Sequence, residues 1–288
     1  MRPSLFEALM PTFTLPFIKL CPGGNPTILI DSEPAYALPA QMRAEIAAAL
    51  LHADHLHGDQ VGFLSMTGAM PHLEMMGGEF CVNAARSAAA VFARKGSLPQ
   101  TGQDEWQGEI SVSGADRPVT VAVRSANATP GSTTVYDSAL ALPLAGISYP
   151  ATASAAGETL VRLPGITHLL IDCAASPRPA DIIKAAAEKR QEYGLEKEEA
   201  AGVVWYEKKQ DGAYAIAPVV YVAATDSSVF ESACGSGSLA VALIAAPQGE
   251  ISVFQPSGHA LSIRFTGETA WIGGSVTITA HGETYVSV

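Results

Sequence analysis

The chain has 288 residues, enough for one large domain or two ordinary domains with a sizeable core. Hydrophobic residues make up 48% of it and charged residues only 16%, a composition that excludes intrinsic disorder. The net charge is −11 and no run of Lys or Arg occurs, which argues against nucleic acid and anionic membranes as main partners.

The sequence also lacks the signals of a membrane span, a disulfide framework or a metal site. No apolar stretch is long enough to cross a bilayer, and Glu7, Pro11 and Pro16 interrupt any signal-peptide core. We therefore expect a cytoplasmic protein whose four cysteines are reduced thiols. No CxxC or CxH spacing occurs, and the three histidines between residues 52 and 57 lack HExxH order, so no metal is expected.

The first half of the chain alternates strand-like and helix-like segments. Residues 39–53 predict a helix with an apolar face, and the residues after Cys81 predict a helix to about Lys95 that Gly96 ends. Strands are expected at residues 12–20, 27–30, 59–66, 110–112, 119–123 and 134–136. Residues 143–157 are punctuated by proline and lack periodicity, so they mark the expected junction between two halves.

The second half repeats this plan. A helix is expected at residues 179–193, stopped by Gly194, and another follows Cys234 and stops near Pro247. The charged residues 196–199 predict an exposed turn. Strands are expected at residues 169–171, 203–206, 219–222, 251–254, 260–265, 270–272 and 276–280. Because strands dominate, with about two long helices in each half, the predicted class is α+β.

Two segments of the chain resemble each other around a cysteine. In residues 77–86 and 230–238, a glutamate lies shortly before the cysteine, and small residues and an Ala-rich apolar run follow it. A second pair, residues 24–31 and 165–172, reads as a glycine turn followed by a strand that ends in Asp. The offsets are similar, 153 residues between the cysteines and 141 between the aspartates, so we infer two related halves. Chance similarity in an Ala-rich chain is the alternative.

A cysteine at the start of a buried helix has a defined chemistry. The first N–H groups of a helix lack partners within it, so they stabilise a thiolate, lower its pKa and bind a substrate carboxylate. Cys81 and Cys234, one as thiolate and one as thiol, can remove a proton from one face of an α-carbon and return one to the other. This suits racemisation of an amino acid without pyridoxal phosphate. A free cysteine is more often a small buried hydrophobe, the role expected for Cys21 and Cys173.

These motifs resemble the diaminopimelate epimerase superfamily of cofactor-independent racemases. Residues 80–86 resemble its first cysteine motif, residues 233–237 its second, and Gly24-Asn25 its N-terminal turn. The resemblance implies an α+β fold of two pseudo-symmetric domains, each a β-structure around a central helix, with the active site in the cleft between them. We expect the N-terminal half at residues 12–142, joined by the last strand at 277–288, and the C-terminal half at 143–276.

Departures from diaminopimelate epimerase point to another substrate. That family has a Glu-Arg pair before its second cysteine to bind distal substrate groups, whereas residues 222–230 contain neither residue type. The chain is more similar to the histidine racemase branch, which supplies D-histidine for staphylopine-type metallophores. That similarity extends over residues 22–29, 59–63, 78–81, 231–237 and 255–258. It implies that Cys81 and Cys234 are the acid–base pair and that no cofactor is used.

The resemblance and the residue chemistry together give a candidate site. The backbone N–H groups expected to hold the substrate carboxylate are those of Val82, Asn83, Gly235 and Ser236. Val82 departs from the family, in which glycine usually follows the first cysteine. The polar side chains expected near the substrate, each of which can also be an ordinary turn, strand or first-turn residue, are Asn25, Asp59, His168 and Glu231.

The sequence therefore predicts an isomerase: a two-base racemase that acts on a small-molecule amino acid, with histidine as the best guess. One alternative is an epimerase or racemase acting on diaminopimelate or another amino acid. Another, of a different class, is a non-catalytic amino-acid-binding protein, which would bind its ligand without solvent exchange at the α-carbon. A homodimer is left open.

Overall fold

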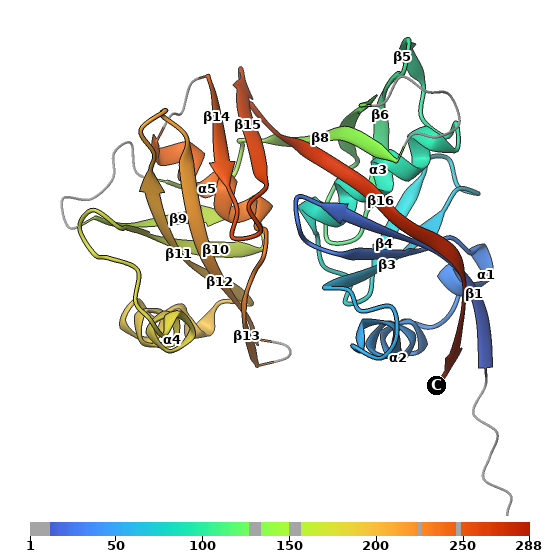
Figure 1. Ribbon diagram of the computed structural model, residues 1–288, viewed down its shortest axis with the longest axis horizontal. Coiled ribbons are helices and arrows are strands. Elements are labelled where there is room, and N and C mark those ends of the chain that lie inside the picture. Colours follow the sequence, from blue (N-terminus) through green and yellow to red (C-terminus); the bar gives the residue numbers. More distant parts are fainter. Residues whose placement is uncertain (1–11, 127–133, 150–156, 224–225, 246–248) are drawn as a thin grey trace, which may run out of the picture.

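Strands dominate the fold, which is α+β as the sequence predicts. The computed structural model describes residues 12–126, 134–149, 157–223, 226–245 and 249–288. Within these residues the strands form one continuous sheet of 16 strands. Figure 1 shows two groups of elements side by side, which β8 (Val135–Pro143) and β16 (Thr269–Ser287) join.

The remaining elements follow in chain order. Those before β8 are β1 (Thr12–Pro22), β2 (Thr27–Ile30), α1 (Glu33–Tyr36), α2 (Ala40–Leu51), β3 (Gln60–Ser65), β4 (His72–Met75), α3 (Val82–Arg94), β5 (Gln100–Gly102), β6 (Glu105–Val112) and β7 (Val119–Ser125). Those between β8 and β16 are β9 (Glu158–Leu163), β10 (Ile166–Asp172), α4 (Ile182–Glu192), the 3-10 helix η1 (Leu195–Lys197), β11 (Ala200–Lys208), β12 (Tyr214–Val222), β13 (Ser227–Phe230), α5 (Gly235–Ala245), β14 (Glu250–Phe254) and β15 (Ala260–Thr266). None of the described helices is long and apolar enough to cross a membrane.

The strand pairing follows the same succession in both parts of the sheet. Along the path β1-β2-β3-β4-β6-β7-β8, the pairs are antiparallel, parallel, antiparallel, parallel, antiparallel and antiparallel. The path β9-β10-β11-β12-β14-β15-β16 has the same six pair types in the same order. The crossover from β4 to β6 contains α3, and the crossover from β12 to β14 contains α5. The two helices therefore occupy equivalent places in the two paths.

Most predicted elements are present, although their bounds differ. The helices expected at residues 39–53, after Cys81 and at 179–193 are α2, α3 and α4, and Gly96 follows α3 with φ of 72°. The expected stop near Pro247 lies outside the described residues. Five short elements, α1, β4, β5, β9 and β13, have no counterpart in the prediction. They are too short for a periodic pattern to stand out against their polar neighbours.

The prediction of two short strands at residues 270–272 and 276–280 is wrong, because β16 is one strand of 19 residues. Its first part pairs with β8 and its second part with β1, so β16 completes a closed ring of paired strands around α3. The Gly273-Gly274 pair read as a break, yet it lies inside the strand. Gly274 has φ of 153°, and a β-carbon there would lie 3.1 Å from Nη2 of Arg86. Glycine suits this position because other residues rarely adopt this φ, and because a β-carbon would also lie 3.1 Å from the backbone carbonyl oxygen of Ala260.

Helix α3 is buried along its length. Every residue from Val82 to Ala93 is buried, which explains its Ala-rich composition: only small side chains fit between a helix and strands on several sides. Arg86 and Phe92 are the exceptions in size, and both are fully buried. Arg86 is the charged one of the two. Its Nε donates to the Ser138 carbonyl of β8 (2.8 Å) and its Nη2 to the Ser275 carbonyl of β16 (3.3 Å). Arg86 therefore ties the helix to both strands that join the two groups of elements.

Replacing Arg86 by methionine should lower the free energy of unfolding by about 3 kcal/mol, because the carbonyls that it satisfies stay buried without a donor. Urea unfolding followed by circular dichroism measures this. Arg124→Met is the matched control, since Arg124 pairs with Asp137 at the surface (3.1 Å) and should cost less than about 1 kcal/mol. Equal losses in the two variants would contradict the structural role of Arg86.

Candidate active site

Each of the two predicted cysteines lies at the start of a buried helix. Cys81 is the N-cap residue of α3, with extended backbone (φ −123°, ψ 115°), and its carbonyl accepts from the N–H of Ala85 (2.9 Å). Cys234 directly precedes α5, and its carbonyl accepts from the N–H of Ser238 (3.1 Å). The prediction that both cysteines head Ala-rich helices is confirmed.

The first turns of these two helices touch. A β-carbon built on Gly235 would lie only 2.7 Å from Cγ1 of Val82, so the contact requires glycine at the start of α5. Beside it, Nδ2 of Asn83 donates to the carbonyl of Ala233 (3.2 Å). The four residues predicted to supply carboxylate-binding N–H groups therefore lie on the two helix turns that meet here.

Cys81 is held by a side chain that the sequence analysis did not identify. Its Sγ donates to Oε1 of Gln60 at 2.8 Å. The Nε2 group of Gln60 in turn donates to Oδ1 of Asn25 (2.6 Å) and Oγ1 of Thr27 (2.7 Å). Asn25, a predicted substrate ligand, thus reaches Cys81 through Gln60. The signal was present, since Gln60 follows Asp59 in a segment singled out by its resemblance.

Cys234 has a different set of neighbours. The Cys234 thiol hydrogen-bonds to the carboxylate of Glu231, and its Sγ lies 3.4 Å from the Gly237 N–H and 3.5 Å from Oγ of Ser236. Its backbone N–H donates to Oε1 of Gln255 (2.9 Å). Gln255 lies in the segment 255–258 but had no predicted role. It fixes the entry to α5, because its Nε2 group also donates to Ser238 and to the Val253 carbonyl.

His168 lies behind Ser236. It is fully buried in β10, and its Nε2 is 3.0 Å from Oγ of Ser236. Burial lowers the pKa of His168 to about 4, so the ring is neutral at pH 7. A β-carbon at Gly202 would lie 2.1 Å from its Nδ1, which explains the glycine on the neighbouring strand β11. His168 thus reaches Cys234 through a hydroxyl.

Asp59 and its neighbours connect residues that are far apart in the sequence. Oγ of Ser232 donates to Oδ2 of Asp59 (3.2 Å), and the N–H of Ser257 donates to the carbonyl of Ser232 (3.0 Å). Oγ of Ser257 donates to the carbonyl of Gly23 (2.7 Å). Burial raises the pKa of Asp59, and the negative charge of Asp59 contributes to the raised pKa of Glu231. The structure therefore brings Asp59, Glu231 and Cys234 together.

The expected lowering of the thiol pKa does not hold in this arrangement. Burial raises the pKa of Cys81 to about 12 and that of Cys234 well above its ordinary value. The N–H groups of Ala84 and Asn83 act in the opposite direction at Cys81, but desolvation of a thiolate outweighs them. Burial also raises the pKa of Glu231, to about 7. Both cysteines are therefore protonated thiols at neutral pH, whereas Glu231, with a pKa of about 7, gains or loses its proton near that pH.

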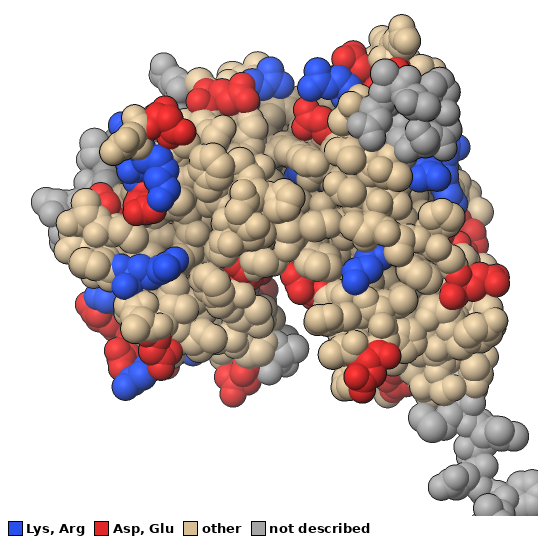
Figure 2. Space-filling model, in the orientation of Figure 1, with Lys and Arg blue, Asp and Glu red and all other residues tan. Residues whose placement is uncertain are grey.

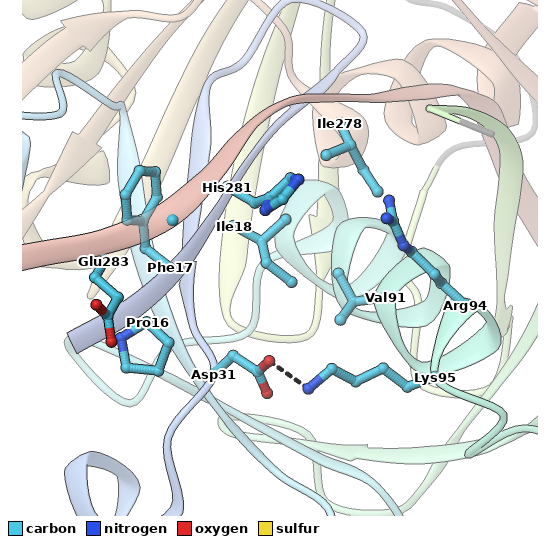
Figure 3. Close-up of a pocket in the computed structure, with 11 residues that line it drawn as sticks. Pro16, Phe17, Ile18, Asp31, Val91, Arg94, Lys95, Ile278, His281 and Glu283 are labelled. Carbon is cyan, nitrogen blue, oxygen red and sulfur yellow. Dashed lines mark hydrogen bonds and ion pairs between the residues drawn. The ribbon is translucent and has the colours of Figure 1, made fainter. Parts of the chain in front are cut away.

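A separate cavity lies at the other end of α3. Its volume is about 360 Å³. Figure 3 shows its lining residues on β1, β16 and the last turn of the helix. It contains the ion pair of Lys95 with Asp31, with Arg94 and His281 on its walls. Because α3 has 13 residues, this cavity is roughly 20 Å from Cys81, too far for a shared substrate.

No group of three or more His, Cys, Asp or Glu side chains able to hold a metal ion occurs among the described residues. His52 is exposed, and its Nδ1 lies 3.6 Å from Oδ2 of Asp54, while His55 contacts the Tyr285 carbonyl. Figure 2 shows Lys and Arg scattered among acidic side chains on the face in view, with no basic tract on that face.

Comparison with known proteins identifies the family. The family model described as the histidine racemase CntK N-terminal domain matches residues 14–285. The chain belongs to this family. It is therefore an isomerase, an amino-acid racemase, and the resemblance seen in the sequence is confirmed.

Curated relatives and solved structures agree with that assignment. The chain is 27% identical over 280 residues to a histidine racemase of Fusobacterium nucleatum, covering 94% of this chain and 97% of the relative. It is 26% identical to a histidine racemase of Staphylococcus aureus with the same coverage. A hydroxyproline epimerase from Agrobacterium vitis aligns with a TM-score of 0.63 at 10% identity, covering 95% and 92% of the two chains. A phenazine biosynthesis protein of the PhzF family from Enterococcus faecalis aligns with a TM-score of 0.60 at 15% identity, covering 95% and 100%. These two structures share the fold.

The buried His168 predicts a defined pH dependence of stability. Its pKa is about 4 in the folded chain against an ordinary 6.5, so only the unfolded chain takes up this proton between those values. The free energy of unfolding should therefore fall as the pH drops through this window. His168→Gln removes the titration, and its stability relative to the unmodified protein should rise by about 3 kcal/mol from pH 7 to pH 4.

Denaturant unfolding at a series of pH values measures this difference. His52→Gln is the control, because that side chain is 69% exposed and should give no such gain. A pH-independent difference for His168→Gln would mean that folding does not lower the pKa of this ring.

Proposed function

We propose that this racemase interconverts L- and D-histidine without a cofactor, with Cys81 and Cys234 as its acid–base pair. The contact between the two helix turns that these cysteines head carries the proposal. It brings two thiols and the first N–H groups of two helices to one place, which is what a two-base mechanism requires. The histidine racemases named above, which the chain matches over nearly its whole length, support histidine as substrate.

The site is proposed to lie in a cleft between two pseudo-symmetric domains. One comprises residues 12–142 with the last strand, 277–288, and the other residues 143–276. The identical succession of strand pairings and the equivalent positions of α3 and α5 support this division. Figure 2 shows the surface indented between the two lobes, with acidic side chains on both walls. Opening at this indentation would admit the substrate, and closing would exclude water.

In the proposed mechanism, the backbone N–H groups of Val82, Asn83, Gly235 and Ser236 hold the substrate carboxylate. One cysteine thiolate takes the α-proton, and the charge left on the substrate is spread over its carboxylate, which the helix N–H groups stabilise. The opposite thiol then gives its proton to the other face of the α-carbon. One proton leaves and one arrives, so the substrate changes only its handedness, and the reverse reaction uses the cysteines in exchanged roles.

Glu231 is proposed to produce the thiolate at Cys234. Its carboxylate accepts the thiol hydrogen bond, and burial brings its pKa to about 7, so it can take the proton at neutral pH. His168 positions Ser236 from behind. Asp59, which Ser232 orients, is proposed to bind an imidazole N–H or the α-ammonium group of the substrate.

Two alternative functions can be distinguished from this proposal by experiment. Diaminopimelate or another amino acid could be the substrate, although residues 222–230 contain no Arg to bind a distal carboxylate. A non-catalytic binder would use the same site without proton transfer. A cytoplasmic location fits the proposal because the reaction needs reduced thiols. A homodimer and a place in metallophore biosynthesis stay predictions of the sequence.

Incubating reduced protein with L-histidine in heavy water should remove the α-proton signal from the proton NMR spectrum and yield D-histidine on chiral chromatography. Exchange is expected because the second cysteine returns a deuteron from solvent. Meso-diaminopimelate and a panel of other amino acids run in parallel decide the substrate. Binding of histidine without any exchange would support the non-catalytic alternative instead.

Cys81→Ser and Cys234→Ser should each lower kcat by at least about a thousandfold, because a hydroxyl is a far weaker acid and base than a thiol at neutral pH. Cys173→Ser is the matched control, since Cys173 directly follows β10 and packs against a core cluster that contains no residue of α3 or α5, so this variant should retain racemisation. Full activity in either Cys81→Ser or Cys234→Ser would refute the two-base scheme.

A further inference from the structure

We propose that Gln60 holds Cys81 as a neutral thiol in the free enzyme, so that Cys81 starts the catalytic cycle as the proton donor and Cys234 as the base. This rests on the proposed two-base function, and it assigns different roles in the first step to two cysteines that the sequence presents as equivalent. Gln60 would be a positioning residue, because it acts on the substrate through Cys81.

The orientation of the Gln60 amide follows from its partners. The hydroxyl of Thr27 donates its single proton to the carbonyl of Asn25 (3.2 Å), so its oxygen must accept the bond from Gln60. The NH₂ group of Gln60 therefore faces Thr27, and Oδ1 of Asn25 accepts its second proton at 2.6 Å. The carbonyl oxygen is left to face Cys81.

A carbonyl oxygen facing a cysteine discriminates between its two protonation states. It accepts a hydrogen bond from the thiol S–H (2.8 Å). A thiolate in the same place would be repelled, because the sulfur and the carbonyl oxygen would both carry negative charge. Rotating the amide would offer an N–H to the thiolate, yet it would also point the carbonyl at the oxygens of Thr27 and Asn25. Because Thr27 is fully buried, no water can compensate, and the rotation is opposed.

Cys234 faces a different kind of acceptor. The Glu231 carboxylate raises the pKa of the Cys234 thiol, as the Gln60 carbonyl does at Cys81, but a carboxylate can also take the proton itself, which an amide carbonyl cannot. The N–H of Gly237 points at the sulfur, where it favours the thiolate. Each arrangement is local: Asn25, Thr27 and Gln60 precede Cys81 in the first half of the chain, whereas Glu231 and Gly237 flank Cys234 in the second. Opening of the cleft would therefore leave both arrangements in place, and the asymmetry belongs to the free enzyme.

The test is the pH dependence of alkylation of each cysteine by iodoacetamide in the full-length, substrate-free protein, resolved by mass spectrometry. The midpoint of each curve reports the pKa of that thiol and is independent of how often the cleft opens. Gln60→Met keeps the length of the side chain but removes the acceptor, so the midpoint for Cys81 should fall by about 0.7 pH unit. Gln60→Glu supplies a charged acceptor and should raise that midpoint.

Thr27→Val is a second, near-isosteric variant that frees the Gln60 amide to rotate, and it should move the Cys81 midpoint in the same direction as Gln60→Met. Cys234, measured in the same samples, should keep its midpoint in all three variants. Gln41→Met is the matched control, because it makes the same change at an exposed glutamine on α2, whose amide donates to Oε1 of Glu45 (3.0 Å). A purely structural role of Gln60 would change thermal stability without moving one midpoint alone.

An unchanged Cys81 midpoint in both Gln60→Met and Thr27→Val, or an equal movement at Cys234, would overturn the assignment. Racemisation measured on the same preparations separates this outcome from failure of the proposed function. Unmodified protein that racemises no amino acid would refute the function, whereas the midpoints would still decide whether Gln60 keeps Cys81 protonated.

Discussion

The contact between the first turns of α3 and α5 is the constraint on which the rest of the structure depends. The two helices approach this closely because α5 begins with glycine: a β-carbon at Gly235 would collide with Val82, the first residue of α3. The approach also has to be held. Arg86, one turn into α3, reaches Oδ1 of Asn83 (3.4 Å), and Asn83 donates across the contact to the carbonyl of Ala233. The buried Arg86 guanidinium thus connects β8 and β16 to the contact between the first turns of α3 and α5.

Burial and helix polarity compete at the cysteines. The N–H groups at a helix start favour a thiolate, whereas a dry surrounding favours the neutral thiol. In this structure the second effect prevails at both positions, and it also brings the pKa of Glu231 to about 7. A site that removes an α-proton gains from this balance, because a thiolate formed in such surroundings is a stronger base than one that is stabilised in water.

The strand order explains how the contact is kept in place. Strand β16 pairs with β15, β8 and β1, so it is shared by the strands around α3 and by those that continue toward α5. The two paths have the same succession of pair types. Each path places its central helix, α3 or α5, with the N-terminus toward the N-terminus of the other helix. Similar local plans therefore produce two cysteines at one place, while the side chains that line each cysteine differ.

The sequence by itself determined the α+β class, the two cysteine-headed helices and the family. These features depend on neighbouring residues: the periodicity of the apolar positions, Gly96 after α3, and motifs of a few residues around Cys81 and Cys234. Only the tertiary structure decided that Gln60 bonds to Cys81, that Gln255 fixes the entry to α5, that His168 lies behind Ser236, and that both thiols are protonated. Each of these depends on residues distant in the chain, or on how much water a site retains. Hydrogen-bond partners and desolvation are set by packing in three dimensions, which no local pattern of the sequence encodes.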